Sequence, residues 1–169
     1  EDGGKNWRKT TQFANTPDGY YVSDVFASPR DANVVFVSLN NWQRGDYKPY
    51  LVRSNDRGRT FTSIAGNLPA RHPVWAVNPD SVNGDLIFAA TEFALFFTVD
   101  GGQRWVQLRG GLPVAQIRDM DIQKRETDLV LGTFGRSFYV LDDYSALPLV
   151  CAPALGEEAR LFPLPLAYQ

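Results

Sequence analysis

Three carboxylates are the side chains in this sequence best suited to acid–base chemistry. Asp119 and Asp121 alternate with their neighbours in a strand-like stretch, so both should point to one face of a sheet. Glu92 follows another apolar run, in a turn that should reach the end of a sheet. Two carboxylates about 5 to 10 Å apart, one protonated and one ionised, can hydrolyse a glycosidic bond. The alternative is structural, with these side chains paired to Arg118, Arg136 or backbone N–H groups.

An aromatic and charged insertion, WQRGDYKPY, offers a second kind of chemistry. A loop of this composition, extending from a sheet, can contact a peptide or a sugar through its rings and its arginine. The alternative of similar weight is a solvent-exposed hairpin tip. The residues that we expect to contact a ligand are Trp42, Arg44, Tyr47 and Tyr50 from this insertion, together with Arg136.

Composition excludes several other functions. His72 is the single histidine and Cys151 the single cysteine, which cannot supply a disulfide within the chain or an ordinary zinc or iron–sulfur site, so we expect no metal and no cofactor. A net charge of -2 with scattered basic residues is unlike a nucleic-acid-binding protein. No apolar run approaches the ~20 residues of a membrane-spanning helix. His72 precedes Pro73, which predicts an exposed or turn position.

One short pattern recurs and organises the chain around these candidates. The segments SNDRGRTF and TVDGGQRW both fit Ser/Thr-x-Asp-x-Gly-x-x-aromatic, which we call the box. The opening EDGGKNW fits without the hydroxyl residue, and LDDYSAL is a degenerate copy. A second short pattern, GNLP and then GGLP, recurs with the same spacing as the two boxes, 44 residues apart. The residues assigned to boxes are Asp2, Gly4, Trp7, Ser54, Asp56, Gly58, Phe61, Thr98, Asp100, Gly102, Trp105 and Asp142.

The residue types of the box predict a structural turn rather than catalysis. A short carboxylate such as Asp56 or Asp100 can accept hydrogen bonds from backbone N–H groups that a tight turn leaves unpaired. The glycines should adopt positive φ, and the aromatic residue should pack beneath the turn. A box alone therefore does not indicate an enzyme.

A period a little over forty residues, with short strands and frequent turns, predicts an all-β fold of propeller blades, each a four-stranded antiparallel sheet. We expect blades at residues 20–69 and 70–113 and a three-stranded blade at 114–150, preceded by an outer strand of an earlier blade within 1–19 and followed by a Pro- and Leu-rich return or linker segment at 151–169. The predicted strands are 7–11; 21–27, 34–39, 50–53 and 60–64; 74–77, 86–90, 95–98 and 104–107; and 117–122, 129–133 and 137–141.

These segments resemble a known group of proteins. YKPYLVRSNDRGRTFTSIAGNLP, IFAATEFALFFTVDGGQRWVQLRGGLP and IRDMDIQKRETDLVLGTFGRSFYVLDDYSAL are similar to the last three blades of bacterial BNR/Asp-box propeller proteins related to the sortilin (Vps10) domain, many of which are labelled glycosyl hydrolases. The resemblance covers residues 20–147. Phe134 stands where the family often has histidine, so the resemblance implies no histidine-dependent activity at that position.

The resemblance implies an extracytoplasmic, periplasmic or secreted, protein. It implies a non-catalytic binding or scaffold propeller that engages a protein, peptide or carbohydrate through its channel or blade loops. The alternative function is a glycoside hydrolase of the sialidase or xyloglucanase kind, with carboxylates at the channel mouth. No acid–base pair stands out in the sequence, which favours binding.

Three blades do not close a ring, because a propeller normally needs about 4 to 8. We therefore expect either further blades in the same parent protein or a second copy that completes the ring, with no nucleic acid and no membrane span in this chain. The start within a box favours a longer propeller, and two copies of three blades are the alternative.

Overall fold

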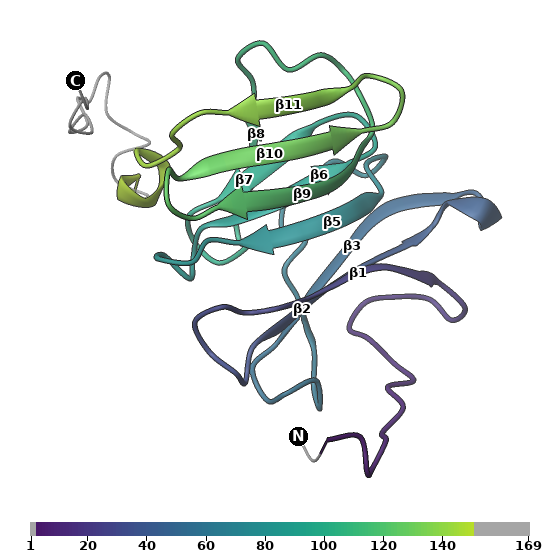
Figure 1. Ribbon diagram of the computed structural model, residues 1–169. Coiled ribbons are helices and arrows are strands. Elements are labelled where there is room, and N and C mark those ends of the chain that lie inside the picture. Colours follow the sequence, from purple (N-terminus) through teal and green to yellow (C-terminus); the bar gives the residue numbers. More distant parts are fainter. Residues whose placement is uncertain (1–2, 151–169) are drawn as a thin grey trace.

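The computed structural model describes residues 3–150, and these residues form eleven strands in three antiparallel sheets (Figure 1). The prediction of an all-β fold is confirmed. Two 3-10 turns, η1 (Trp42–Arg44) and η2 (Leu147–Leu149), are the helical elements of the described part. The strands are β1 (Tyr21–Ala27), β2 (Val35–Asn41), β3 (Asp46–Ser54), β4 (Thr62–Ser63), β5 (Val74–Pro79), β6 (Ile87–Thr91), β7 (Leu95–Thr98), β8 (Val106–Leu108), β9 (Ile117–Gln123), β10 (Asp128–Thr133) and β11 (Phe138–Leu141).

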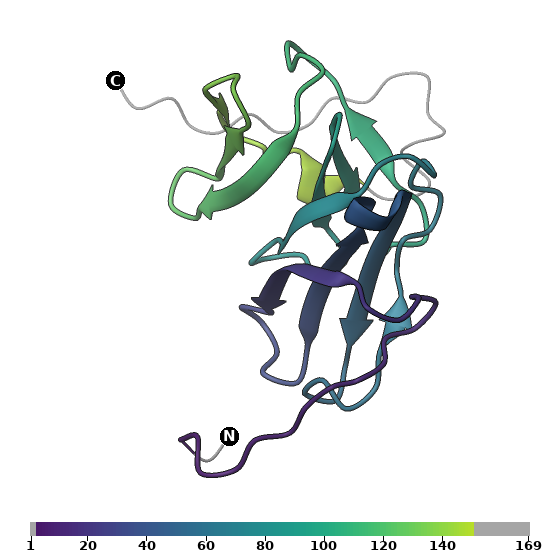
Figure 2. The ribbon, with the colours of Figure 1, turned by 90° about the vertical axis from the view of Figure 1, so that its right-hand side faces the viewer.

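Each sheet is a simple meander, in which consecutive strands pair. The sheet orders are β1-β2-β3-β4, β5-β6-β7-β8 and β9-β10-β11, and we call these sheets the first, second and third blade. The first strands β1, β5 and β9 lie next to one another, with β5 in contact with both (Figures 1 and 2). Sheets that share an inner line of strands and fan outward are arranged as propeller blades.

The core lies between successive blades. One cluster joins the first blade to the second through Phe36, Leu51, Val77 and Phe96, and another joins the second to the third. All residues of β5, β6 and β7 are buried, because this blade has a neighbour on both faces. Strands covered on both faces are continuously apolar rather than alternating.

The box turns follow the third strands, and their hydrogen bonds are nearly identical. Ser54 Oγ donates to Asp56 Oδ1 at 2.8 Å, and this oxygen accepts the Arg59 and Thr60 N–H groups at 2.9 and 2.8 Å. At the second box, Thr98 Oγ1 donates to Asp100 Oδ1 at 2.6 Å. That oxygen accepts the N–H groups three and four residues later at 2.9 and 3.0 Å. Each carboxylate thus pairs backbone donors that the turn leaves unmatched.

Glycine and the aromatic residue complete the second box. Gly102 has φ +102°, and a Cβ at this position would lie 2.6 Å from Cβ of Ile64, so no other residue fits without displacing the chain. Trp105 is buried beneath the turn and donates its Nε1 hydrogen to Ile64 O at 2.8 Å. In the first box, Gly58 also has positive φ, and Phe61 is partly buried with its ring packed edge-on against Phe13.

The fourth strands begin later than the sequence predicts. We expected strands from Thr60 and Arg104, whereas β4 and β8 begin two residues further on. The reason is that the backbone N–H groups of Thr60 and Arg104 donate to the box carboxylates. A group bound to the turn is not available to the strand ladder.

The opening copy of the pattern differs from its prediction. Asp2 lies outside the described residues, while Gly4 has φ +83° as expected of the pattern. The expected strand at 7–11 is absent from the described structure, and Trp7 is 90% exposed rather than packed. No described strand pairs with this segment, so no ladder forms. Instead Arg8 donates to the carbonyl oxygens of Arg57 and Gly58 in the next box turn.

The degenerate copy is displaced by one residue from the predicted Asp142. The backbone bonds Arg57 N to Asn33 O and Gly101 N to Asp85 O recur as Tyr144 N to Thr127 O, at 2.8 to 3.1 Å. This match makes Asp143 the counterpart of Asp56. Asp143 Oδ1 accepts the Ser145 N–H at 3.0 Å, whereas no described residue bonds the carboxylate of Asp142.

Asp56 should contribute to stability above about pH 4. Hydrogen bonds from the Thr60 side chain, the Thr60 N–H and Ser54 hold the pKa of Asp56 well below its usual value. The contribution is therefore full above the unfolded pKa of about 3.9 and is lost as the pH falls toward the folded pKa. We expect Asp56→Asn to lower the free energy of unfolding in urea at pH 7, and the difference from the parent chain to shrink toward pH 3.

Asp142→Asn is the matched control for this measurement, because it removes a carboxylate without hydrogen bonds in the described structure. It should leave the unfolding free energy unchanged at both pH values. Equal effects of the two substitutions would contradict the role assigned to the box turn.

Candidate functional site

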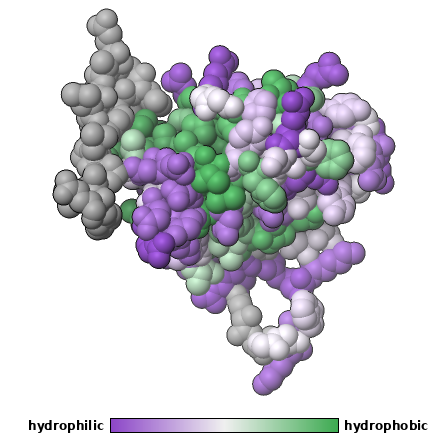
Figure 3. All heavy atoms as spheres, turned by 45° about the horizontal axis from the view of Figure 1, so that its top comes forward, coloured by the Kyte–Doolittle hydropathy of each residue, from purple (hydrophilic) through white to green (hydrophobic). Residues whose placement is uncertain are grey.

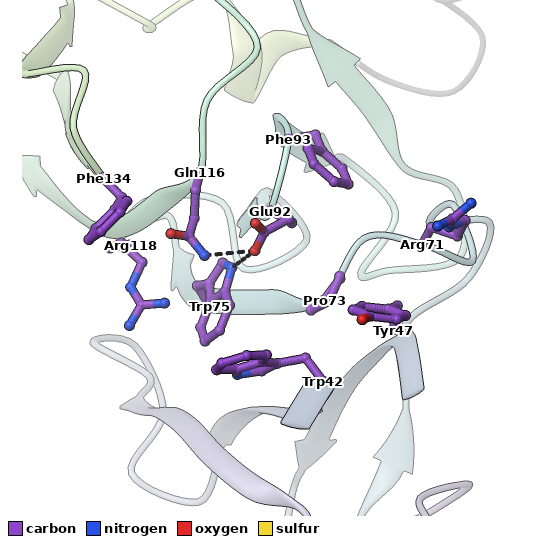
Figure 4. A pocket seen from close by; sticks show the side chains of 10 residues that line it. All are labelled: Trp42, Tyr47, Arg71, Pro73, Trp75, Glu92, Phe93, Gln116, Arg118 and Phe134. Carbon is purple, nitrogen blue, oxygen red and sulfur yellow. Dashed lines mark hydrogen bonds between the residues drawn. The ribbon is translucent and has the colours of Figure 1, made fainter. Parts of the chain in front are cut away.

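The loops at one end of the blades meet around a pocket. Because neighbouring strands are antiparallel, second strands end where first strands begin, and box turns lie at the opposite end. The pocket, about 470 Å³ in volume, lies at the end without boxes. Its lining comes from all three blades: Trp42, Tyr47, Arg71, Pro73, Trp75, Glu92, Phe93, Gln116, Arg118 and Phe134 (Figure 4).

Glu92 is fixed at the base of this pocket by two donors. Its Oε2 accepts Trp75 Nε1 at 2.9 Å and Gln116 Nε2 at 2.7 Å (Figure 4). Its own backbone N–H donates to Pro73 O at 3.1 Å. The carboxylate thereby ties the second blade to the entry of β9 in the third. Two N–H donors on one oxygen hold the Glu92 side chain in a single orientation.

An aromatic and cationic stack forms the neighbouring wall. The guanidinium carbon of Arg118 lies 4.0 Å from the ring centroid of Trp75, and Trp42 packs edge-on to Trp75 at 6.4 Å. A cation over an indole face is attracted by about 0.5 to 2 kcal/mol. The guanidinium N–H groups of Arg118 have no hydrogen-bond acceptor within residues 3–150, so they can bind a ligand.

The structure places two of the predicted ligand-loop residues in the pocket and two outside it. Trp42 and Tyr47 line the pocket and are 43% and 46% exposed, whereas Arg44 and Tyr50 do not line it. Arg44 Nη1 donates to Asp18 O at 3.3 Å. Tyr50 is buried, and its hydroxyl donates to Asp46 Oδ2 at 2.5 Å; burial and this carboxylate raise the pKa of Tyr50.

The three predicted acid–base residues do not lie together. Glu92 lines the pocket, but Asp119 and Asp121 do not. Both aspartates are exposed on the face of β9 opposite buried Met120, and each accepts a backbone N–H of the residue that follows it. Arg136 is exposed in the β10–β11 turn and also lies outside the lining. The structure thus gives the pocket one of the three carboxylates.

His72 is more enclosed than its place before Pro73 predicts. Its ring lies between Phe93 and Phe96, at 5.3 and 5.4 Å, and its Nδ1 is 3.0 Å from Thr91 Oγ1. The Thr91 hydroxyl hydrogen is donated to Ala94 O, so Nδ1 of the neutral ring is the donor. Burial lowers the pKa of His72, against an opposing effect of Glu92.

Sequence reasoning missed most of the pocket, although a signal was present. Trp42, Phe93 and Phe134 each follow the second strand of a blade within two residues. Equivalent loops of successive blades meet at one end, so this recurrence points to a shared aromatic surface. The lining residues not selected from the sequence as ligand contacts are Arg71, Pro73, Trp75, Phe93, Gln116, Arg118 and Phe134.

Residues 3–150 offer neither a metal site nor a membrane-spanning helix. No group of three or more His, Cys, Asp or Glu side chains in this range has the arrangement to hold a metal ion. No helix in the same range is long and apolar enough to cross a membrane.

Comparison with known proteins gives the fold of this chain. No protein-family model matches it, and no curated protein sequence matches it. Among solved structures it is similar to an ancestral GH74 enzyme, at 23% identity over 68% of this chain and a TM-score of 0.55. It is also similar to YCF48 bound to D1 peptide, at 16% identity over 85% of this chain and a TM-score of 0.59. A third similar structure is the GH74 enzyme of Niastella koreensis, at 17% identity over 72% of this chain and a TM-score of 0.58.

These similarities, together with the three fanned sheets, establish a β-propeller fold. The chain spans less than half of each similar structure: 14% of the ancestral GH74 enzyme, 43% of YCF48 and 21% of the Niastella koreensis enzyme. The resemblance to sortilin-like proteins remains a prediction.

His72 should make stability depend on pH between about 5.5 and 7.5. Its lowered folded pKa means that the unfolded chain, with a pKa of about 6.5, takes up the proton first. The free energy of unfolding should therefore fall as the pH drops through this window. Because His72 is the sole histidine, His72→Asn should flatten the dependence, as measured by urea unfolding. An unchanged slope in the variant would contradict this assignment.

Proposed function

We propose that this chain is a non-catalytic binding part of a β-propeller, and that its pocket holds an extended ligand without transforming it. The observation that carries this proposal is the aromatic lining drawn from three blades, with exposed rings at Trp42, Tyr47, Phe93 and Phe134. Exposed rings held by a rigid scaffold bury large areas at low entropic cost. Such a surface binds well without any reaction.

The contacts of Glu92 support binding over catalysis. A general acid must present its carboxyl group to the substrate, whereas Oε2 of Glu92 already accepts the Trp75 and Gln116 N–H groups. Among the described lining residues it is also the single carboxylate. Its contacts connect two blades, which is a positioning role for the pocket wall.

The favoured ligand is a peptide segment with an apolar side chain beside an acidic group. The rings provide an apolar surface, while Arg71 and Arg118 outnumber Glu92 and give the lining a net positive charge. An arginine with unpaired N–H donors binds a carboxylate well. The similar fold of YCF48, solved with D1 peptide, and the sortilin-like resemblance support a peptide or protein partner. With that resemblance we also propose an extracytoplasmic location.

A glycoside hydrolase is the second candidate, favoured by the presence of Glu92 within an aromatic pocket and by the two GH74 enzymes of similar fold. Aromatic rings also bind the apolar faces of sugars. A hydrolase would need a partner carboxylate about 5 to 10 Å from Glu92. Asp119 and Asp121 point elsewhere, so this partner would come from outside the described residues.

Tryptophan variants test whether the pocket binds peptides. We expect Trp42→Ala to weaken binding of an acidic, aromatic peptide from a defined library by about fivefold or more, since ring truncations at binding centres cost over ~1 kcal/mol. Calorimetric titration measures the affinity. Trp7→Ala is the matched control, because Trp7 is 90% exposed and lies outside the pocket. Equal loss in both variants, or none in Trp42→Ala, would exclude this site.

Replacing the carboxylate separates the two candidate functions. If the protein only binds, Glu92→Gln should show no change in a hydrolysis assay on oligosaccharides, because neither form turns them over. Loss of a measured glycan turnover in Glu92→Gln would instead favour the hydrolase. Turnover that persists in both Glu92→Gln and Asp119→Asn would exclude these residues as catalysts.

A further inference from the structure

A groove separate from the aromatic pocket lies at the end of the blades that carries the box turns. It has a volume of about 470 Å³, which is in the range of small-molecule sites. Arg30 and Arg53 line it from the first blade, Gly84 from the β5–β6 turn of the second blade, and Leu149 from η2. Segments that are far apart in the sequence therefore meet in one place.

The β5–β6 turn leaves one backbone donor of the groove unused. Asp80 Oδ1 accepts the N–H groups of Val82 and Asn83 at 2.9 and 2.6 Å, and Asn83 Oδ1 accepts that of Asp85 at 3.0 Å. Gly84 lies between these bonded residues, and its own N–H has no acceptor within residues 3–150. A donor left over in a turn held this firmly is available to a ligand.

The same turn is tied to η2, which also lines the groove. Asn83 Nδ2 donates to Pro148 O at 3.3 Å, and the Tyr144 hydroxyl donates to Asp80 Oδ2 at 2.9 Å. Asp80 and Tyr144 are buried, so water does not compete for the second of these contacts. The groove therefore has walls that are in place before a ligand binds.

Arg53 is held so that the far edge of its guanidinium group stays free. Its Nε donates to Asn55 Oδ1 at 2.8 Å, and its guanidinium carbon lies 5.6 Å from the ring centroid of Phe36. Its two Nη atoms have no acceptor in the described part of the chain. An arginine positioned through Nε and the face of its guanidinium presents its terminal N–H groups to a ligand at low entropic cost.

Arg30 lies beside Gly84. A Cβ at Gly84 would be 3.6 Å from Arg30 Nε, so the guanidinium group borders the space that a side chain would fill there. The side chain of Arg30 has no hydrogen-bond acceptor and no ion-pair partner among residues 3–150. Unused donors from Arg30, Arg53 and Gly84 thus line one groove.

The charge of the lining indicates which anion fits. Asp85 also lines the groove, and no ion pair within residues 3–150 joins it to either arginine. Two arginines and one aspartate leave a single positive charge in excess. A singly charged anion neutralises this lining, and a guanidinium group matches a planar carboxylate with two parallel hydrogen bonds.

The groove also has an apolar part. Val82 is 72% exposed and Leu149 is 48% exposed, and Pro148 lines the groove next to Leu149. Figure 3 shows one side of the molecule, on which apolar side chains gather in the middle and many hydrophilic ones lie around the edge. In the groove both kinds of side chain lie together, so a ligand with a charged head and an apolar body covers both.

We propose that this groove binds a small organic acid with a short apolar chain. Its carboxylate lies between Arg30 and Arg53 and accepts the Gly84 N–H, while the chain packs on Val82 and Leu149. The proposal goes beyond the aromatic pocket and does not depend on it, because the two sites lie at opposite ends of the blades and share no residue.

Titration of the full chain with hexanoate, followed by NMR of the backbone amides, tests this assignment. At pH 7 we expect a saturable shift of the Gly84 amide signal, and binding of acetate that is weaker by about fivefold or more, because acetate lacks the apolar chain. Hexanol and hexylammonium lack the negative charge and should leave this signal in place. No saturable shift with hexanoate, or equal affinity for acetate or hexanol, would overturn the proposal.

Arginine variants locate the site. We expect Arg30→Gln to weaken hexanoate binding by about fivefold or more, because charge-assisted hydrogen bonds are lost. The side chain of Arg30 is exposed and unpaired within residues 3–150, so this variant should keep the fold. Arg59→Gln is the matched control, since Arg59 is an exposed arginine of the first box turn and lies outside the groove. Equal weakening in both variants, or none in Arg30→Gln, is the result that would rule out this groove.

Discussion

The need of each sheet to cover two faces governs this structure. A single layer of strands exposes apolar side chains on one side or both, and it is stable only when another layer covers them. The second blade meets this condition fully, since β5, β6 and β7 are buried throughout between the first and third blades. The polar contacts across each boundary, such as Asp24 to the Val77 N–H, fix the register at which one blade meets the next.

The turns at one end of the blades stabilise the fold, and the loops at the other end line the pocket. At one end the box carboxylates Asp56 and Asp100 satisfy backbone donors, and this requirement leaves little freedom in residue type. At the other end, the loops after the second strands have no such requirement. Trp42, Phe93 and Phe134 occupy equivalent places there with different neighbours. A repeated fold can therefore vary its ligand surface without disturbing the turns that hold each blade together.

Local patterns predicted the fold far better than the site. Most strands were found from alternation and turn residues, because these signals lie within a few residues of one another. The starts of β4 and β8 were missed because Thr60 and Arg104 bond to a turn carboxylate, which outweighs their strand propensity. Choosing Asp142 over Asp143 required a backbone bond to Thr127 that no local spacing reveals. The pocket depends on contacts among three blades, so only Trp42 and Tyr47 from the insertion and the carboxylate Glu92 were anticipated.

Strand register also bears on catalysis. Asp119 and Asp121 were attractive as an acid–base pair because they share one face of a strand, and the structure retains that geometry. Sharing a face is also what an inter-blade contact requires, and Asp24 and Asn78 hold the corresponding positions with backbone partners in the next blade. A carboxylate that binds a backbone N–H inside an interface between blades is held away from any substrate. Positions suited to such a contact lie outside the pocket, and Glu92, already bound by Trp75 and Gln116, is the sole described carboxylate that lines it.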